Sequence, residues 1–219
     1  RVVQGLALAQ QSDVALVPGP LERGVEWLKN YQQQEVRKLL NAPAKTKPYK
    51  EYASNLDAYV FLVLVNQGVT NEQMYDFLYR DRTKLSVYAL GMLGLASHKL
   101  ERQDRLAMLM DNMDQYLVQD PENQTAYLNL PENNWWWHWY GNEVEANAYY
   151  LKLLSKVDPQ NPKAAQLVKY LLNNRKHGTY WSSVSDTAIA VEALAEYWTA
   201  SGEDQPDLTL EVYLDGEKQ

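Results

Sequence analysis

The stretch "LSVYALGMLGLASHKLERQDRLAMLMDNMDQYL", residues 85–117, decides the expected fold because it joins two helical patterns of different kinds. Residues 85–97 are apolar on nearly every side, whereas residues 102–117 place apolar residues on one face and charged residues on the other. A helix that is apolar all round must be buried on every side, while an amphipathic helix covers it and faces water. This stretch therefore predicts an inner helix followed by an outer one.

The same alternation runs along most of the chain. Nearly all-apolar segments lie at 56–65, 85–97, 145–154 and 186–197, and amphipathic segments lie at 21–32, 71–80, 102–117 and 162–175. An inner layer of helices wrapped by an outer layer satisfies this pattern. We therefore expect an all-α protein built as an α/α toroid of helical hairpins, similar to that of terpenoid cyclases.

Helix-boundary residues agree with these segments. Pro20 and Pro162 stand where a first helical turn needs no N–H donor. Asn142 is expected to be an N-cap, paired with Glu145 three residues later. Gly178 is placed to end a helix in the left-handed region, and Ser185 to cap the next helix.

The C-terminal residues change period. In "DLTLEVYLDG", residues 207–216, every second residue from Leu208 to Leu214 is apolar, and an Asp-Gly pair follows. This is the pattern of a strand and a turn. We expect residues 1–204 to form a helical domain whose first helices are missing. Residues 205–219 are expected to form a linker and the first strand of a following β domain.

Composition excludes several classes of protein. The formal charge is −7 without a block of basic residues, which argues against nucleic-acid binding. The chain has no cysteine, so it forms no disulfide, thiolate nucleophile or cysteine-ligated zinc site of its own. No apolar run is long enough to span a bilayer, and we expect no transmembrane segment.

An aromatic cluster stands out at the end of the longest break between helices, residues 119–141. Its members are Trp135, Trp136, Trp137, His138, Trp139 and Tyr140. An exposed patch of this kind would mark contact with a ligand or partner. A buried one would contribute about 25 cal/mol for each Å² removed from water. Because an inner helix follows directly, we favour a plug over the helix ends and keep ligand or interface contact as the alternative.

Catalytic and metal chemistry have little support. His98, His138 and His177 lie in three different connections without ligand spacing, which favours structural roles. Glu143, Glu145 and Asp186 flank helix starts, where acids complement the helix dipole. Paired carboxylates could also act on a glycosidic bond. We expect no metal ion, cofactor or catalytic residue.

The order of segments resembles the last third of the thioester domain of alpha-2-macroglobulins and complement proteins. The resemblance rests on "GNEVEANAYYLKLL" and on "QLVKYLLNNRKHGTYWSSVSDTAIAVEALAEY", residues 141–154 and 166–197. Upstream, "GPLERGVEWLKNYQ", "SNLDAYVFLVLV" and "RTKLSVYALGMLGLA" are similar to earlier helices of that domain. The entry "WYGNEVEANA" is more like bacterial members than animal ones.

This resemblance implies an α/α toroid in a large extracytoplasmic protease trap, in the bacterial periplasm or at the cell surface. A lipid anchor at a distant N-terminus is compatible with it. The implied partners are macroglobulin-type β domains of the same polypeptide and the target proteases. In this family a protease cuts a bait region, and an internal Cys–Gln thioester then acylates it.

The chain departs from the family in two places. The thioester motif Cys-x-Glu-Gln is absent, so it would lie upstream of Arg1 or be lacking. Where some members carry a histidine before a middle inner helix, "TKPYKEYASN" holds Tyr49 and Tyr52 instead. We therefore expect a thioester-free, non-enzymatic domain of the endopeptidase-inhibitor family. The alternative is a toroid enzyme similar to a terpene cyclase or a glycosidase.

Overall fold

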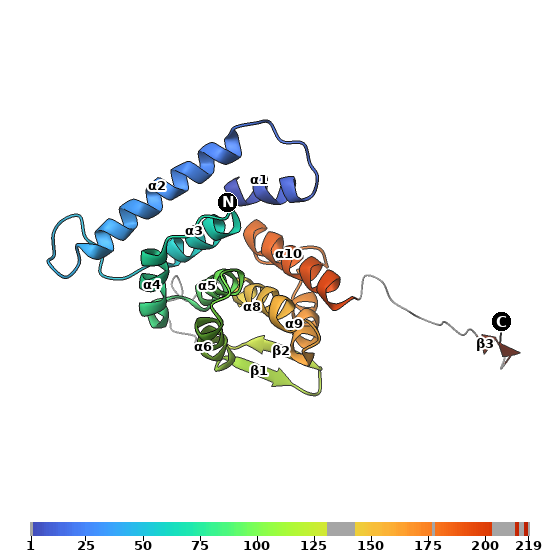
Figure 1. Ribbon diagram of the computed structural model, residues 1–219. Coiled ribbons are helices and arrows are strands. Elements are labelled where there is room, and N and C mark those ends of the chain that lie inside the picture. Colours follow the sequence, from blue (N-terminus) through green and yellow to red (C-terminus); the bar gives the residue numbers. More distant parts are fainter. Residues whose placement is uncertain (1, 131–142, 177, 203–212, 215–216, 219) are drawn as a thin grey trace.

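The computed structural model describes residues 2–130, 143–176, 178–202, 213–214 and 217–218, and it is mostly helical (Figure 1). The helices are α1 (Val2–Gln11), α2 (Pro20–Leu40), α3 (Asn55–Asn66), α4 (Glu72–Arg80), η1 (Arg82–Lys84), α5 (Val87–Lys99), α6 (Gln103–Asp114), α8 (Glu143–Val157), α9 (Pro162–Asn173) and α10 (Val184–Ser201). The strands are β1 (Leu117–Asp120), β2 (Thr125–Leu128), β3 (Tyr213–Leu214) and β4 (Glu217–Lys218). The expected all-α class agrees with this structure, to which short β-hairpins are added.

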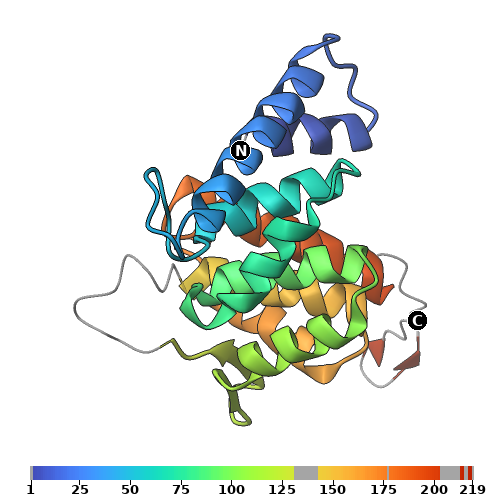
Figure 2. The ribbon, with the colours of Figure 1, turned by 60° about the vertical axis from the view of Figure 1, so that its left-hand side comes forward.

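The helices form two packed layers. The apolar helices contact one another in chain order, α3 on α5, α5 on α8 and α8 on α10. Each amphipathic helix covers a neighbour in this inner layer: α2 and α4 lie on α3, α6 lies on α5 and α9 lies on α8. Figures 1 and 2 show this succession of helical pairs from two sides. The predicted division into inner and outer helices is confirmed for these pairs.

Burial agrees with the predicted division for three inner helices but not for the fourth. Phe61, Leu93 and Leu151 are fully buried in α3, α5 and α8. Helix α10 was expected to be buried on every side, and this expectation is wrong. Its outward face exposes Val191, within the predicted segment 186–197, and also Val184 and Trp198 on either side of it. The reason is that the described helices cover α10 from one side, through α8 and α9.

Two glycines let α5 approach α8 closely. A Cβ atom added at Gly91 would lie 2.8 Å from the Cβ of Tyr149, and one added at Gly94 would lie 2.8 Å from Cδ2 of Leu153. Both distances are shorter than a normal van der Waals contact between carbon atoms. The absent side chains therefore set the separation of these two inner helices.

Local signals placed most helix ends well. Pro20 and Pro162 are the first residues of α2 and α9, as predicted. The cap of α10 is Ser183 rather than Ser185, because Ser183 Oγ accepts a hydrogen bond from the backbone N–H of Asp186. Gly178 has the expected positive φ, but α9 ends earlier, at Asn173. Asn142 lies outside the described residues.

The segment after α6 is a correction to the sequence analysis. The expected helix over 102–117 ends at Asp114, and part of the expected break forms the antiparallel hairpin β1–β2, with Leu117 opposite Leu128. The hairpin packs on α9 and α8, and the backbone N–H of Leu128 donates a 2.8 Å hydrogen bond to Asn147 Oδ1 in α8. Tertiary contact therefore selects strand over helix here.

The C-terminal strands agree in part with expectation. Strands β3 and β4 pair antiparallel, with Tyr213 opposite Lys218. The expected strand at 208–214 is described only at its end, since residues 208–212 lie outside the described residues. Membership of a following β domain stays a prediction. Within the described part of the chain, no helix combines the length and apolar character needed to cross a bilayer.

Candidate functional site

Several residues singled out in the sequence lie outside the described residues. These are the whole aromatic cluster Trp135–Tyr140, which includes His138, and also His177. The role of the aromatic cluster as a plug or a contact site therefore stays a prediction. His98, at the end of α5, lies beside a cavity. Among the described residues, no group of histidines and carboxylates has the arrangement of a metal site.

The three candidate carboxylates are not brought together around a cavity. Glu143 accepts a hydrogen bond from the hydroxyl of Tyr170 in α9. Glu145 lines a shallow depression at the first turns of α3, α5 and α8. Asp186 is buried in the first turn of α10. These positions agree with structural roles at helix starts.

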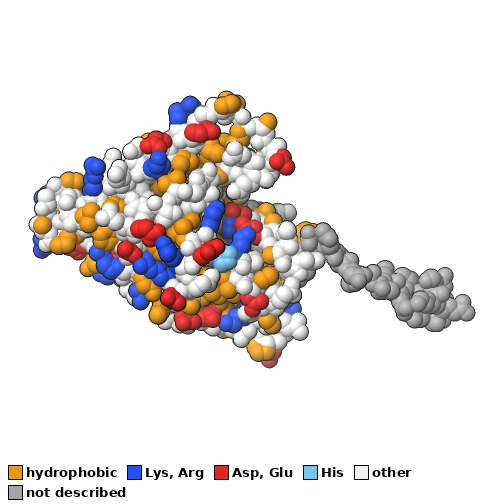
Figure 3. Space-filling model, in the orientation of Figure 1, with side chains coloured by type: hydrophobic (Ala, Val, Ile, Leu, Met, Phe, Trp, Pro, Cys, Tyr) orange, Lys and Arg blue, Asp and Glu red, His pale blue; other side chains and the backbone are white. Residues whose placement is uncertain are grey.

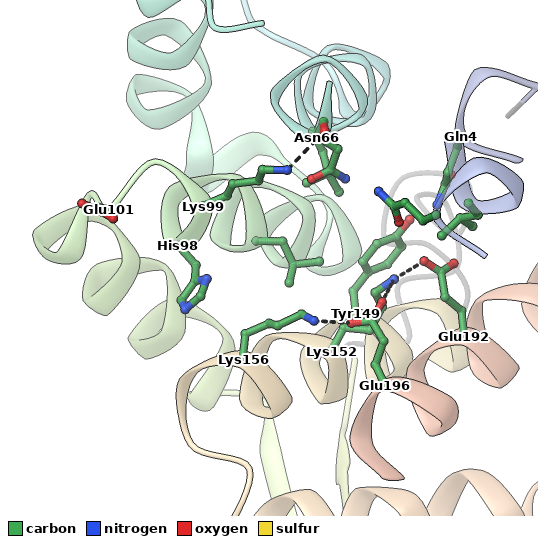
Figure 4. A pocket seen from close by; sticks show the side chains of 14 residues that line it. Gln4, Asn66, His98, Lys99, Glu101, Tyr149, Lys152, Lys156, Glu192 and Glu196 are labelled. Carbon is green, nitrogen blue, oxygen red and sulfur yellow. Dashed lines mark hydrogen bonds and ion pairs between the residues drawn. The ribbon is translucent and has the colours of Figure 1, made fainter. Parts of the chain in front are cut away.

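A cavity of about 480 Å³ among the inner helices brings together charged side chains from different helices (Figure 4). Its walls come from α1, α3, α5, α8 and α10. The lining residues are Gln4, Leu8, Gln11, Leu62, Asn66, Leu95, His98, Lys99, Glu101, Tyr149, Lys152, Lys156, Glu192 and Glu196. Lysine and acidic side chains gather in the hollow on this side of the molecule (Figure 3). We call this feature the central cavity.

Lys152 forms the centre of an ion-pair network in this cavity. Its side chain comes from α8, is only 6% exposed and contacts Glu192 and Glu196 of α10. The Nζ–Oε1 distance to Glu196 is 3.0 Å, and Lys156 Nζ lies 3.3 Å from the other oxygen of Glu196. Figure 4 shows the side chains of Lys152, Glu192 and Glu196 turned toward one another. A buried ammonium needs such partners because desolvation penalises an isolated charge by several kcal/mol.

The arrangement limits what the cavity can do chemically. A glycosidase needs one carboxyl group that donates a proton and a second that acts as base or nucleophile. Here both carboxylates of α10 are bonded to the same ammonium group, and Glu101 lies on the opposite side of the cavity (Figure 4). The network therefore ties α8 to α10 and gives Glu192 and Glu196 the same ammonium partner.

Sequence reasoning missed this cavity. Lys152 and Lys156 were visible as two cations at helical spacing in an otherwise apolar segment. Glu192 and Glu196 have the same spacing in the segment 186–197. Two complementary charged pairs on helices expected to be buried were the available signal, because buried charges are almost always paired.

A second polar cluster lies where the family resemblance drew attention to Tyr49 and Tyr52. Both tyrosine side chains are largely exposed. The half-buried residue of this connection is Lys50, whose Nζ lies 2.9 Å from Glu35 Oε2 and 2.5 Å from Asp57 Oδ2. Desolvation lowers the pKa of Lys50. The hydrogen bonds that its ammonium group donates to Asp57 and Glu35 raise the pKa by more, so the net shift is upward.

The direction of that shift excludes one kind of chemistry. A lysine that acts as nucleophile or base needs a lowered pKa, so that the free amine is present near neutral pH. Lys50 instead stays an ammonium group and joins α2 to the first turn of α3 through Glu35 and Asp57. For Glu35, burial raises the pKa, but hydrogen bonds from Lys38 and Lys50 outweigh it and lower the pKa overall. The cluster is a structural clamp.

Two tyrosine hydroxyls with raised pKa values make the free energy of unfolding depend on pH in the alkaline range. Burial, followed by the hydrogen bond that its hydroxyl donates to Asp114, raises the pKa of Tyr150 far above its usual range. Burial, followed by the hydrogen bond that its hydroxyl donates to Glu143, also raises the pKa of Tyr170. A folded-state pKa above the unfolded value of about 10 contributes stability that is complete below that pH and lost as the pH rises.

We therefore expect the free energy of unfolding to fall as the pH rises above about 10. Urea unfolding measured at several pH values from neutral to alkaline would show this. Tyr150→Phe keeps the ring but removes the titrating hydroxyl, so its alkaline loss should be smaller than that of the unmodified chain. An equal loss in both proteins would show that Tyr150 does not couple folding to proton release.

Comparison with known proteins adds no family to these observations. No family model matches the sequence, and no curated protein matches it.

Proposed function

We propose that this chain is a non-enzymatic helical domain of an alpha-2-macroglobulin-like protein, acting through its interfaces with neighbouring domains. The observation that carries the proposal is the central cavity, where the buried Lys152 of α8 is bonded to two partly exposed glutamates of α10. Charges bonded in this way support a role in holding α8 and α10 together. The exposed apolar face of α10 is a surface suited to a protein contact.

The finer architecture belongs to the same proposal. Side chains from α1, α3, α5, α8 and α10 surround one cavity, and these helices alternate with outer ones. This arrangement supports an α/α toroid whose axis passes through the central cavity. The proposed setting is extracytoplasmic, in a polypeptide with macroglobulin-type β domains and with proteases as targets. These features rest on the sequence resemblance.

The proposal is tested with the polypeptide that carries this chain. It is incubated with a trypsin-like or an elastase-like protease, and residual activity is measured on a protein substrate and on a small chromogenic peptide. A trap blocks access of large substrates but admits small ones. We therefore expect activity on the protein to fall while activity on the peptide remains. Unchanged cleavage of both substrates would overturn the proposal.

The alternative is a toroid enzyme, and one observation favours it. The volume of the central cavity falls within the range of about 300–1,000 Å³ typical of small-molecule sites. Turnover of oligosaccharides or prenyl diphosphates that is lost in Glu192→Gln would support this alternative. We expect no turnover and no ligand-induced rise in melting temperature, because the α10 carboxylates are occupied by Lys152.

A further inference from the structure

Helix α10, at the edge of the helical layers in Figure 1, has an apolar face that no described element covers. Val184 is 89% exposed, Val191 53% and Trp198 57%. Ala188 and Ala195 are also exposed and lie between them. The five positions are separated by four, three, four and three residues, the spacing of one continuous helix face. We call this surface the α10 stripe.

The stripe is free of charge, although the chain carries a formal charge of −7. The acidic residues of α10 point elsewhere: Asp186 is buried, and Glu192 and Glu196 are paired with Lys152. Two like-charged copies of a protein repel each other unless they meet through neutral surface. The α10 stripe offers such a surface, and a two-fold contact places the same neutral face on both sides.

The two ends of the stripe differ in shape. An open apolar depression of about 520 Å³ lies at its N-terminal end, lined by Tyr180, Trp181, Val184 and Ala188 among others. At the other end the large ring of Trp198 projects into solvent. Positions 184 and 198 are each seven residues from Val191, or about 10 Å along the helix. A two-fold axis at Val191 would therefore bring Trp198 of one copy over the depression of the other.

We propose that the α10 stripe binds a second copy of this chain, with the two α10 helices antiparallel and crossing at Val191. The small side chains of Ala188 and Ala195 flank the crossing and permit a close approach of the helices. The stripe is about 21 Å long and smaller than the roughly 800 Å² per partner of a standard interface. The contact is accordingly weak, with a dissociation constant on the order of 10–100 μM.

Sedimentation equilibrium tests the contact over protein concentrations from about 1 to 500 μM, which bracket the expected affinity. The unmodified chain should form dimers as its concentration rises. Val191→Glu places two like charges at the crossing and should leave a monomer throughout. Trp198→Ala removes the projecting ring and should weaken association at least tenfold, as expected for an aromatic side chain that fills a depression of the partner.

The matched control is Trp27→Ala. Trp27 is also a highly exposed tryptophan, at 65%, but lies on α2 and stacks on Tyr31. The Trp27→Ala variant should associate like the unmodified chain. Circular dichroism checks that each variant keeps its helices, which is expected because the replaced side chains face solvent. A monomer at every concentration of the unmodified chain would overturn the proposal, as would equal weakening by Trp27→Ala and Trp198→Ala.

Cross-linking tests the predicted geometry separately. Because the chain contains no cysteine, Val191→Cys introduces a single thiol at the proposed two-fold axis. Two such thiols would face each other, and a disulfide requires Cα atoms within about 7 Å. Mild oxidation should give a covalent dimer. Leu172→Cys, at an exposed position of α9, is the control and should stay monomeric. Absence of the Val191→Cys dimer, or equal dimer in both variants, would overturn the two-fold arrangement.

Discussion

Replacing Lys152 with methionine should lower the free energy of unfolding by about 1–3 kcal/mol, because a buried ammonium group loses its bonds while Glu192 and Glu196 keep some contact with water. Methionine retains most of the apolar volume of the side chain, so the change isolates the charge. Without the ammonium group of Lys152, Glu192 loses its ion pair and Glu196 keeps the one with the more exposed Lys156. Urea unfolding followed by circular dichroism measures the loss.

Two further variants separate charge from packing. Lys156→Met removes a cation whose side chain is 47% exposed and should cost less than about 1 kcal/mol. Combining Lys152→Met with Glu192→Gln and Glu196→Gln removes the unpaired charges and should recover much of the lost stability. A Lys152→Met protein as stable as the unmodified chain would show that the network does not hold α8 to α10.

Gly91→Val should destabilise the protein by about 3 kcal/mol, near the upper end of the range for overpacked cores. The added Cβ would lie 2.8 Å from the Cβ of Tyr149, an atom fixed to the backbone of α8. Rotation of the Tyr149 side chain cannot relieve this overlap, so α5 and α8 must move apart. Urea unfolding at neutral pH gives the magnitude.

The matched control is Gly5→Val in α1, where an added Cβ meets no atom within 4 Å. It applies the same chemical change to a helix that has room for it. We expect a change within about 0.5 kcal/mol, because valine and glycine differ little in helix propensity. Equal destabilisation at both positions would point to helix propensity rather than to the α5–α8 contact.

The two experiments probe the two contacts that α8 makes within the inner layer, one with α5 and one with α10. Shape holds α8 against α5, through the glycines of α5, and charge holds it against α10, through Lys152. Helix α8 is therefore the element whose displacement would disturb both the central cavity and the α10 stripe. A domain that works through its surfaces needs such a fixed inner layer behind them.

Much of the fold could be predicted because the evidence for it is local. A segment such as 56–65 is apolar on nearly every side, which favours burial, and most of its residues are buried in α3. Pro162 starts α9 because the first turn of a helix does not use its N–H group. These signals depend on residues a few positions apart, which a sequence displays directly.

The features of the candidate site depend on residues far apart in the chain. Lys152 and Glu192 come together only because α8 packs beside α10. The hairpin β1–β2 replaces an expected helix end because Asn147 accepts its Leu128 N–H and α9 covers it. The exposure of Val191 was missed for the same reason, since hydrophobic periodicity identifies an apolar face but not which faces have a partner.

The sequence by itself determined the kind of helix, its approximate extent and the alternation of inner and outer layers, because helix periodicity and capping are local properties. Only the tertiary structure decided which charges meet in the central cavity and which apolar face of α10 stays uncovered. Both depend on how helices cross. That crossing is set by small differences in side-chain volume, such as the glycines of α5, at contacts between residues distant in sequence.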